Sequence, residues 1–187
     1  MRYFSILCLL ALFALGCTKD RIFETENPGG NNPPVIDSSN VVGSLMVNEV
    51  VSSGGILPSE FGPGGDWFEI YNPKTIACTL EAGKWFVTDD FANPEQFELP
   101  PITINALSRL VVFCDDSNRV LTYIHTNFKL SSTGEKLGII YKAENSDVFV
   151  DSVSFGAQGS NEASARIPDG SPIWVFPVVP TPGQPNQ

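Results

Sequence analysis

The sequence has only one histidine, His125, among 187 residues. A metal site or catalytic centre that needs two or three histidines is therefore excluded. The Gly-x-Ser-x-Gly pattern of a nucleophile elbow is missing too, and no glycine-rich loop precedes a helical pattern, as nucleotide binding would need. We therefore interpret His125 as a structural histidine and expect that the protein is not an enzyme.

Positive charge is also scarce. The chain has 11 Lys and Arg against 21 Asp and Glu, which gives a net charge of −10. Duplex DNA carries a phosphate charge about every 1.7 Å, and proteins bind it through Lys and Arg. The basic residues here are scattered, and no aromatic residues alternate with a basic stripe. We expect no nucleic-acid partner.

Helical patterns are absent after residue 16. No later segment repeats apolar residues at i, i+3 and i+4 over three turns. Short runs instead alternate with period two between turn residues, and the chain contains 16 Gly and 15 Pro. The pattern predicts strands at residues 45–51, 66–71, 75–80, 85–88, 107–114, 136–141, 148–155 and 173–178. Such strands indicate an all-β fold, an antiparallel β-sandwich of about seven to nine strands.

The first 16 residues have the pattern of a secretory signal peptide. Arg2 supplies a positive start, and the apolar run at residues 4–15 is shorter than the roughly 20 residues of a membrane span. The run ends in Ala14-Leu15-Gly16-Cys17, which resembles the lipobox of bacterial lipoproteins. In those proteins the cysteine thiol receives a diacylglycerol, so the resemblance implies cleavage after Gly16 and lipidation of Cys17.

Residues 17–41 are expected to comprise the lipidated cysteine and a flexible polar tether rich in Gly, Pro and Asn. Loss of Arg2 with the signal peptide would leave 10 basic against 21 acidic residues, a net charge of −11. Lys19-Asp20 resembles a tag of bacterial lipoproteins sent to the outer face of the outer membrane. We expect an outer-membrane protein held by its lipid, with the outer and periplasmic faces both left open.

Residues 42–187 form the expected folded domain, and they resemble the lamin tail domain family, whose members are immunoglobulin-like sandwiches. The resemblance covers nearly the whole domain through a series of short motifs in the family's order. These motifs are residues 47–50, 66–72, Trp85 with Thr88-Asp89, 125–135, 150–153, 165–170, Trp174 and 180–186.

The physical chemistry of the motif residues indicates mostly structural roles. We expect core tryptophans, polar residues that hold loops, turn glycines with positive φ, and an Arg166 paired with Glu49 or Glu69. The expected core tryptophans are Trp67, Trp85 and Trp174. The polar residues expected to hold loops are Asn48, His125 and Asn127, and the expected turn glycines are Gly134 and Gly170.

Carboxylates at predicted strand ends are the one set that suggests ligand chemistry. Asp66, Glu69, Asp89 and Asp90 could converge on one rim of the sandwich, and Ca²⁺ binds six to eight oxygen ligands on such loops. No Asp-x-Asp-x-Asp loop is present, so these residues are interpreted first as solvated turn residues, with calcium as the alternative cofactor.

Cys78 and Cys114 remain after Cys8 leaves with the signal peptide and Cys17 takes the lipid. Both lie on predicted strands, and exported proteins can form disulfides. A Cys78–Cys114 bridge and two separate buried thiols are both open.

The sequence therefore predicts a non-enzymatic lipoprotein of the cell envelope. Its membrane contact would be the lipid, and its domain would bind a protein, a glycan or the envelope. The alternatives are a purely structural envelope protein and an accessory component of an exported hydrolase system.

Overall fold

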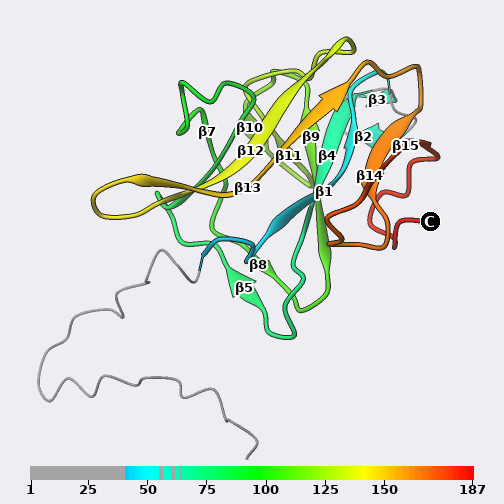
Figure 1. The fold of residues 1–187 in the computed structure, drawn as a ribbon. Helices are drawn as coiled ribbons and strands as arrows, with labels where there is room; N and C mark the ends of the chain where they lie inside the picture. Colours follow the sequence, from blue (N-terminus) through cyan, green and yellow to red (C-terminus); the bar gives the residue numbers. More distant parts are fainter. Residues whose placement is uncertain (1–40, 55–56, 60–61, 64) are drawn as a thin grey trace, which may run out of the picture. The chain divides into compact units, whose positions relative to one another are not determined.

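The computed structural model describes residues 41–54, 57–59, 62–63 and 65–187, all within one compact unit, Val35–Gln187. The predicted signal peptide, Cys17 and the tether up to residue 40 lie outside the described residues. The described part is all-β and contains fifteen strands (Figure 1). They are β1 (Met46–Val51), β2 (Pro58–Ser59), β3 (Gly62–Pro63), β4 (Asp66–Tyr71), β5 (Cys78–Thr79), β6 (Trp85–Thr88), β7 (Phe97–Glu98), β8 (Thr103–Ile104), β9 (Arg109–Cys114), β10 (Arg119–Val120), β11 (Ile124–His125), β12 (Gly134–Lys142), β13 (Asp147–Gly156), β14 (Ala163–Arg166) and β15 (Trp174–Val178).

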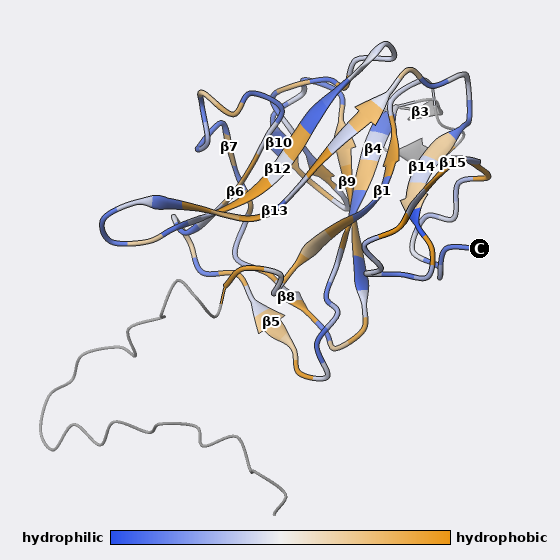
Figure 2. Ribbon diagram, in the orientation of Figure 1, coloured by the Kyte–Doolittle hydropathy of each residue, from blue (hydrophilic) through white to orange (hydrophobic). Residues whose placement is uncertain are grey.

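Two main sheets build the sandwich. The larger sheet has seven strands in the order β10-β11-β9-β4-β1-β14-β15, and the smaller has four in the order β13-β12-β6-β7. Two short ribbons, β2-β3 and β5-β8, complete the described strands. The long β12–β13 hairpin ends in a hydrophilic turn, whereas hydrophobic residues follow the strands that face the interior (Figure 2). The predicted β-sandwich is confirmed.

Eight of the fifteen strands have four or more residues, and the other seven have two. The predicted strands at residues 66–71 and 85–88 match β4 and β6, whereas the prediction at residues 75–80 shrinks to the two residues of β5. The expectation of a purely antiparallel fold is wrong at one place, because β11 pairs with β9 in parallel. β14 was not predicted at all, although it pairs with both β1 and β15.

The main core lies between the two large sheets. Its residues include Val47, Phe68 and Ile70 from the seven-stranded sheet and Leu137 and Ile139 from β12. Predicted core residue Trp85 is 5% exposed. Val41 is also buried in this cluster, so the packed domain includes a residue that the sequence placed in the tether.

The seven-stranded sheet is covered on its other face as well. Five of the six residues of β4 are buried, so both faces of this strand are removed from water. A small second cluster contains Val51, Trp67, Phe113 and Ala163 and covers part of that outer face. We call the outer face of β1 and β4 the strap face, because residues 180–186 (the strap) hydrogen-bond to a buried glutamate side chain of each strand.

The described part of the chain has no helix. Accordingly, no helix of these residues is long and apolar enough to cross a membrane.

Candidate functional site

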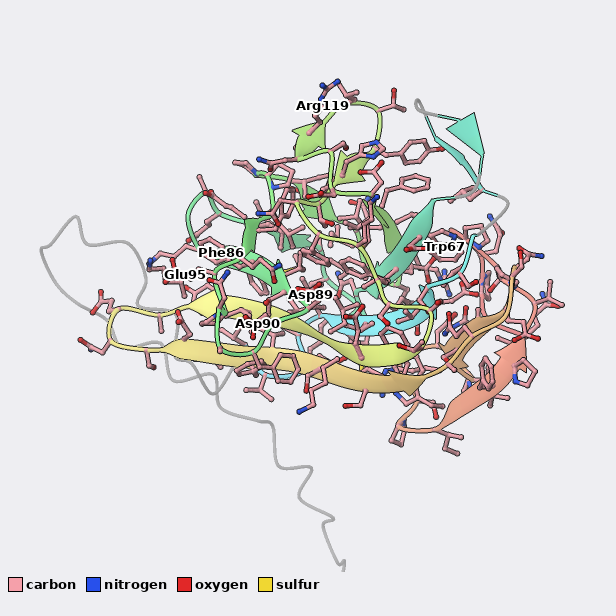
Figure 3. The ribbon with its side chains drawn as sticks, turned by 90° about the horizontal axis from the view of Figure 1, so that it is seen from above. Trp67, Phe86, Asp89, Asp90, Glu95 and Arg119 are labelled. Carbon is pink, nitrogen blue, oxygen red and sulfur yellow. The ribbon has the colours of Figure 1, made fainter. Side chains whose placement is uncertain are left out.

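The carboxylates predicted to converge are distributed over different parts of the fold. Asp66 begins β4, and Asp89 and Asp90 follow β6 in the other large sheet. Figure 3 shows Asp89 and Asp90 on the same side as Phe86 and Glu95 and away from Trp67. Among the described residues, no three His, Cys, Asp or Glu side chains are placed to hold a metal ion.

Asp66 and Asp89 do share an acidic neighbour. Burial, followed by the charges of Asp89 and Asp66, raises the pKa of Glu135. Glu135 accepts a hydrogen bond from the Ser131 amide, and Asp66 accepts one at 3.3 Å from the Gly54 amide. Backbone donors thus hold Glu135 and Asp66, which makes them loop-organising residues.

Glu69 is the clearest correction to the sequence interpretation. It is fully buried in the middle of β4, not solvated at a strand end. The alternation of β4 places Glu69 on the same face as Trp67 and Tyr71, and its partner across the β1–β4 ladder is Glu49. Two like charges directly opposite on one sheet face are unfavourable unless other groups compensate.

Asn48 organises the polar contacts beside Glu69. Its side-chain amide donates at 3.0 Å to Glu69 Oε1 and at 2.8 Å to Asp169 Oδ1. Its Oδ1 accepts the Gly170 amide at 3.0 Å, at a turn where the φ of Gly170 is +69°. The expected loop-holding role of Asn48 and the positive φ of Gly170 are confirmed.

Arg109 of β9 is the cation that faces this cluster. Its guanidinium forms an ion pair with Asp169, its Nε lies 3.7 Å from Glu69 Oε1, and its Cζ lies 5.0 Å from the centre of the Tyr71 ring. One arginine therefore contacts two acids of the cluster, Glu69 and Asp169.

The strap covers the two buried glutamates. The Thr181 amide donates at 2.9 Å to Glu49 Oε1, and the Gly183 amide donates at 2.7 Å to Glu69 Oε2. The Asn186 amide donates to Asp169 Oδ1 at 3.1 Å, and its buried side chain reaches the backbone carbonyls of Asn48 and Arg166. The strap is thus held through specific donors placed over acidic side chains.

Burial is the main reason that both glutamates are hard to ionise. Desolvation raises the pKa of Glu49 to about 7, and the charges of Glu69 and Asp169 act in the same direction, whereas the hydrogen bond from the Thr181 amide opposes the rise. Desolvation also raises the pKa of Glu69 to about 7, although hydrogen bonds from Asn48 and Gly183 and the charge of Arg109 oppose this change. The strap face therefore holds acids that titrate near neutral pH.

Arg166 pairs with Asp151 rather than with Glu49 or Glu69, so the expected partner was wrong. Its guanidinium lies 3.1 Å from Asp151 Oδ2, donates to Val47 O at 2.8 Å and stacks 4.9 Å from the centre of the Trp174 ring. Asp151 on β13 also accepts the Val47 amide at 2.8 Å. Trp174 is partly buried and packs against the main core cluster, so it lies at the edge of the core, whereas Trp67 and Trp85 are buried.

His125 is buried, as a structural histidine should be, although it lies in the short strand β11 and not in a loop. Its Nδ1 lies 2.7 Å from Asp115 Oδ2, and its ring stacks on Phe113. Burial opposes the change, but hydrogen bonds from Ser117 and His125 lower the pKa of Asp115. Ser117 Oγ donates to Asp115 Oδ1, so this acid ties β11 to the turn after β9.

Cys78 and Cys114 are separate free thiols in the structure; Cys114 is buried, whereas Cys78 is only partly buried, so the second alternative holds in part. Cys78 lies in the β5–β8 ribbon, and Cys114 ends β9 in the seven-stranded sheet. Burial raises the pKa of both thiols, so each behaves as an apolar packing residue and not as a reactive thiolate.

A groove lies beside β9, β10 and β11, at the β10 edge of the seven-stranded sheet. It has a volume of about 370 Å³ and is lined by residues 100–102, 109–111 and 120–124. Its rim exposes two large apolar side chains, Val120 at 54% and Leu121 at 52%. We call this feature the β9–β11 groove, and its size is within the usual range for ligand pockets.

A smaller recess of about 190 Å³ lies between β13 and the edge strand β15. Phe176 on this edge is 48% exposed, and Ile173 just before the strand is 61% exposed. Pro177 lies in β15 and has no backbone N–H to offer a further strand.

No family model matches the chain, and no curated protein matches it. Sequence reasoning did not find the strap face or the β9–β11 groove. The motif at residues 180–186 was the available signal for the strap, and the run Val120-Leu121 was the signal for the groove rim.

Proposed function

We propose that this chain is a non-enzymatic lipoprotein of the cell envelope, a lamin-tail-type module that binds a protein partner through the β9–β11 groove. The groove is the observation that carries the proposal. Contiguous exposed apolar surface marks interaction sites, and here the exposed Val120 and Leu121 adjoin the apolar lining of the groove. The acids that might otherwise suggest chemistry, Glu49, Glu69 and Asp169, are engaged in contacts that hold the strap.

A protein segment fits the groove better than a glycan. Sugar hydroxyls need several converging donors and acceptors. The lining is mainly proline and aliphatic side chains, with Arg109, Thr122 and Tyr123 as the polar members, and Arg109 is already paired with Asp169. An apolar peptide segment would bury the exposed Val120 and Leu121 side chains.

Photo-crosslinking tests the groove. A photoreactive amino acid at position 121 should form a defined protein adduct in intact cells, because Leu121 lies on the groove rim. The same substitution at Ile76, which is 72% exposed outside the groove, is the matched control and should form no such adduct. Equal labelling at both positions, or none at position 121, would count against the groove.

The anchor has a separate test. Cys17→Ser should release the protein from the membrane fraction and abolish labelling by palmitate, because the proposed acyl acceptor is lost. Ser5→Ala, within the same leader, is the control and should leave labelling intact. Persistent labelling of Cys17→Ser would contradict lipidation at this residue.

Nucleic acid is not among the proposed partners. The acidic net charge supports this, as does the pairing of Arg109 and Arg166 with Asp169 and Asp151. A titration with duplex and single-stranded DNA at about 50 mM salt favours non-specific binding and should show none.

A further inference from the structure

The Thr181 hydroxyl lies between two oxygen atoms that could both accept its proton. Its Oγ1 is 2.9 Å from Asn186 Oδ1 and 3.3 Å from Glu49 Oε2. A hydroxyl has one proton to donate and two lone pairs to accept. Only one of these two contacts can therefore be donated by Thr181.

The orientation of the Asn186 amide decides which contact that is. Its Nδ2 faces two backbone carbonyls, Asn48 O at 3.1 Å and Arg166 O at 2.9 Å. Both are acceptors, so the NH₂ group must point at them and Oδ1 must point at Thr181. The amide oxygen can only accept, and the Thr181 proton therefore goes to Asn186.

Glu49 Oε2 then faces a hydroxyl oxygen whose proton is already used. Two oxygen atoms at 3.3 Å make a hydrogen bond only if one of them carries a proton for the other. We propose that Glu49 is a proton-binding site of the folded protein, that Oε2 carries the proton and donates it to Thr181 Oγ1, and that strap attachment is thereby coupled to proton uptake.

Desolvation raises the pKa of both Glu49 and Glu69 to about 7, and the contacts around them favour the proton on Glu49. Glu69 of β4 receives donors at both oxygens, from Asn48 and Gly183, with Arg109 of β9 beside it. Asp169, after β14, accepts from Asn48, Asn186 and Arg109. Glu69 and Asp169 therefore have the contacts of ionised acids.

The remaining charges near Glu49 do not neutralise it. On β14 and β13, Arg166 and Asp151 pair with each other. Arg109 is shared between Glu69 and Asp169, so a third negative charge on Glu49 would have no cation of its own. Desolvation accordingly raises the pKa of Glu49 to about 7, which agrees with a protonated acid at and below neutral pH.

Linkage makes the coupling reciprocal. Burial raises the proton affinity of Glu49 and is the largest influence on it, whereas the hydrogen bond from the Thr181 amide lowers it. Where burial under the strap outweighs that hydrogen bond, proton uptake strengthens strap attachment by the same factor. The proton is held below a pH of about 7, so the strap is held most firmly there and loosens as the pH rises through that value.

A carbon-detected NMR titration of the glutamate carboxyl groups in the whole chain tests the site. We expect the Glu49 carboxyl to titrate near pH 7. Titration near its ordinary value of 4.5 would overturn the proposal, whatever any variant does.

Two variants of Thr181 then test the direction of the hydrogen bond. Thr181→Val removes the acceptor of the Glu49 proton and should lower the Glu49 pKa by about half to one unit, the size of one neutral hydrogen bond. A rise in the Glu49 pKa would show that Thr181 was the donor and would overturn the assignment. Thr181→Ser keeps the hydroxyl and should leave the titration almost unchanged, as should Glu98→Gln, which alters an exposed carboxylate that accepts the Gly83 amide.

Discussion

The strap face and the β9–β11 groove lie on the same seven-stranded sheet and differ in what they bury: the first buries acidic groups, and the second exposes apolar ones. On the strap face, buried Glu49 and Glu69 are opposite each other and are covered by residues whose backbone amides bind them. In the groove, apolar Val120 and Leu121 are left exposed. Polar groups that are buried must be paired, whereas exposed apolar groups cost little in the free protein. The first region therefore holds the fold together, and the second is available for a partner.

The largest effect is expected from Trp67, in the apolar part of the outer face. Trp67 is 1% exposed and packs in the cluster of Val51, Phe113 and Ala163. Trp67→Ala should lower the free energy of unfolding by about 3–5 kcal/mol in a denaturant titration. Trp67→Phe is the control: it keeps most of the apolar area and removes a buried indole N–H that has no acceptor among the described residues, so its loss should be much smaller.

A variant that keeps full stability but loses a partner would mean that Trp67 is a binding platform. That outcome would contradict its assignment to the core.

Asn48 tests the polar half of the same face. Asn48→Ala leaves two carboxylates and the Gly170 amide without their shared partner, and each lost buried hydrogen bond carries a desolvation penalty. We expect a loss of about 3 kcal/mol in the free energy of unfolding. Asn145→Ala, in the exposed β12–β13 turn, should change it by no more than about 0.5 kcal/mol. Equal losses in the free energy of unfolding for the two variants would show that the contacts of Asn48 on the strap face do not stabilise the fold.

Stability should also depend on pH through Glu49. The folded pKa is raised from 4.5 to about 7, so the stabilising contribution of the proton is complete below pH 4.5 and is lost as the pH rises through 7. Glu49→Gln replaces the carboxylic O–H by an amide N–H of similar shape, which keeps a donor toward Thr181 at every pH. Relative to the natural chain, this variant should gain up to about 3 kcal/mol between pH 4.5 and 8. A constant difference across that range would contradict the raised pKa.

The smallest effect on stability is expected at the groove. Leu121→Glu changes an exposed rim residue and should alter the free energy of unfolding by no more than about 0.5 kcal/mol. It should nevertheless abolish the adduct formed from a photoreactive residue at position 123, because a charged side chain would have to lose its hydration on binding. An unchanged adduct would show that the partner does not contact this rim.

The sequence predicted the long strands because their patterning is local. Period-two alternation predicted β4 and β6, and polar turn residues between two apolar runs predicted the hairpin of β12 and β13. β14 was missed because Ala163-Ser164-Ala165-Arg166 is short and alternates only through small alanines, which are uncommon in strands. Its strand structure depends on pairing with β1 and β15, which is a tertiary effect.

The strap face was less predictable for a different reason. Alternation alone places Glu69 on the face of Trp67 and Tyr71, so its burial could have been inferred. Its position opposite Glu49 depends on a register shift in β1 between Val47 and Glu49. The Thr181 and Gly183 contacts use backbone amides, which carry no signature in the sequence.

Hydrogen exchange measured across pH compares the two regions most directly. Amide exchange rates, corrected for the intrinsic effect of pH, give the protection of the Thr181 and Gly183 amides and of residues 119–124 at the groove. The account predicts that strap protection falls by about tenfold or more between pH 5 and 8, while protection at the groove stays constant and Glu49→Gln abolishes the fall. Strap protection that is constant or rises over this range, or that falls equally in Glu49→Gln, would contradict the claim that a proton on Glu49 holds the strap.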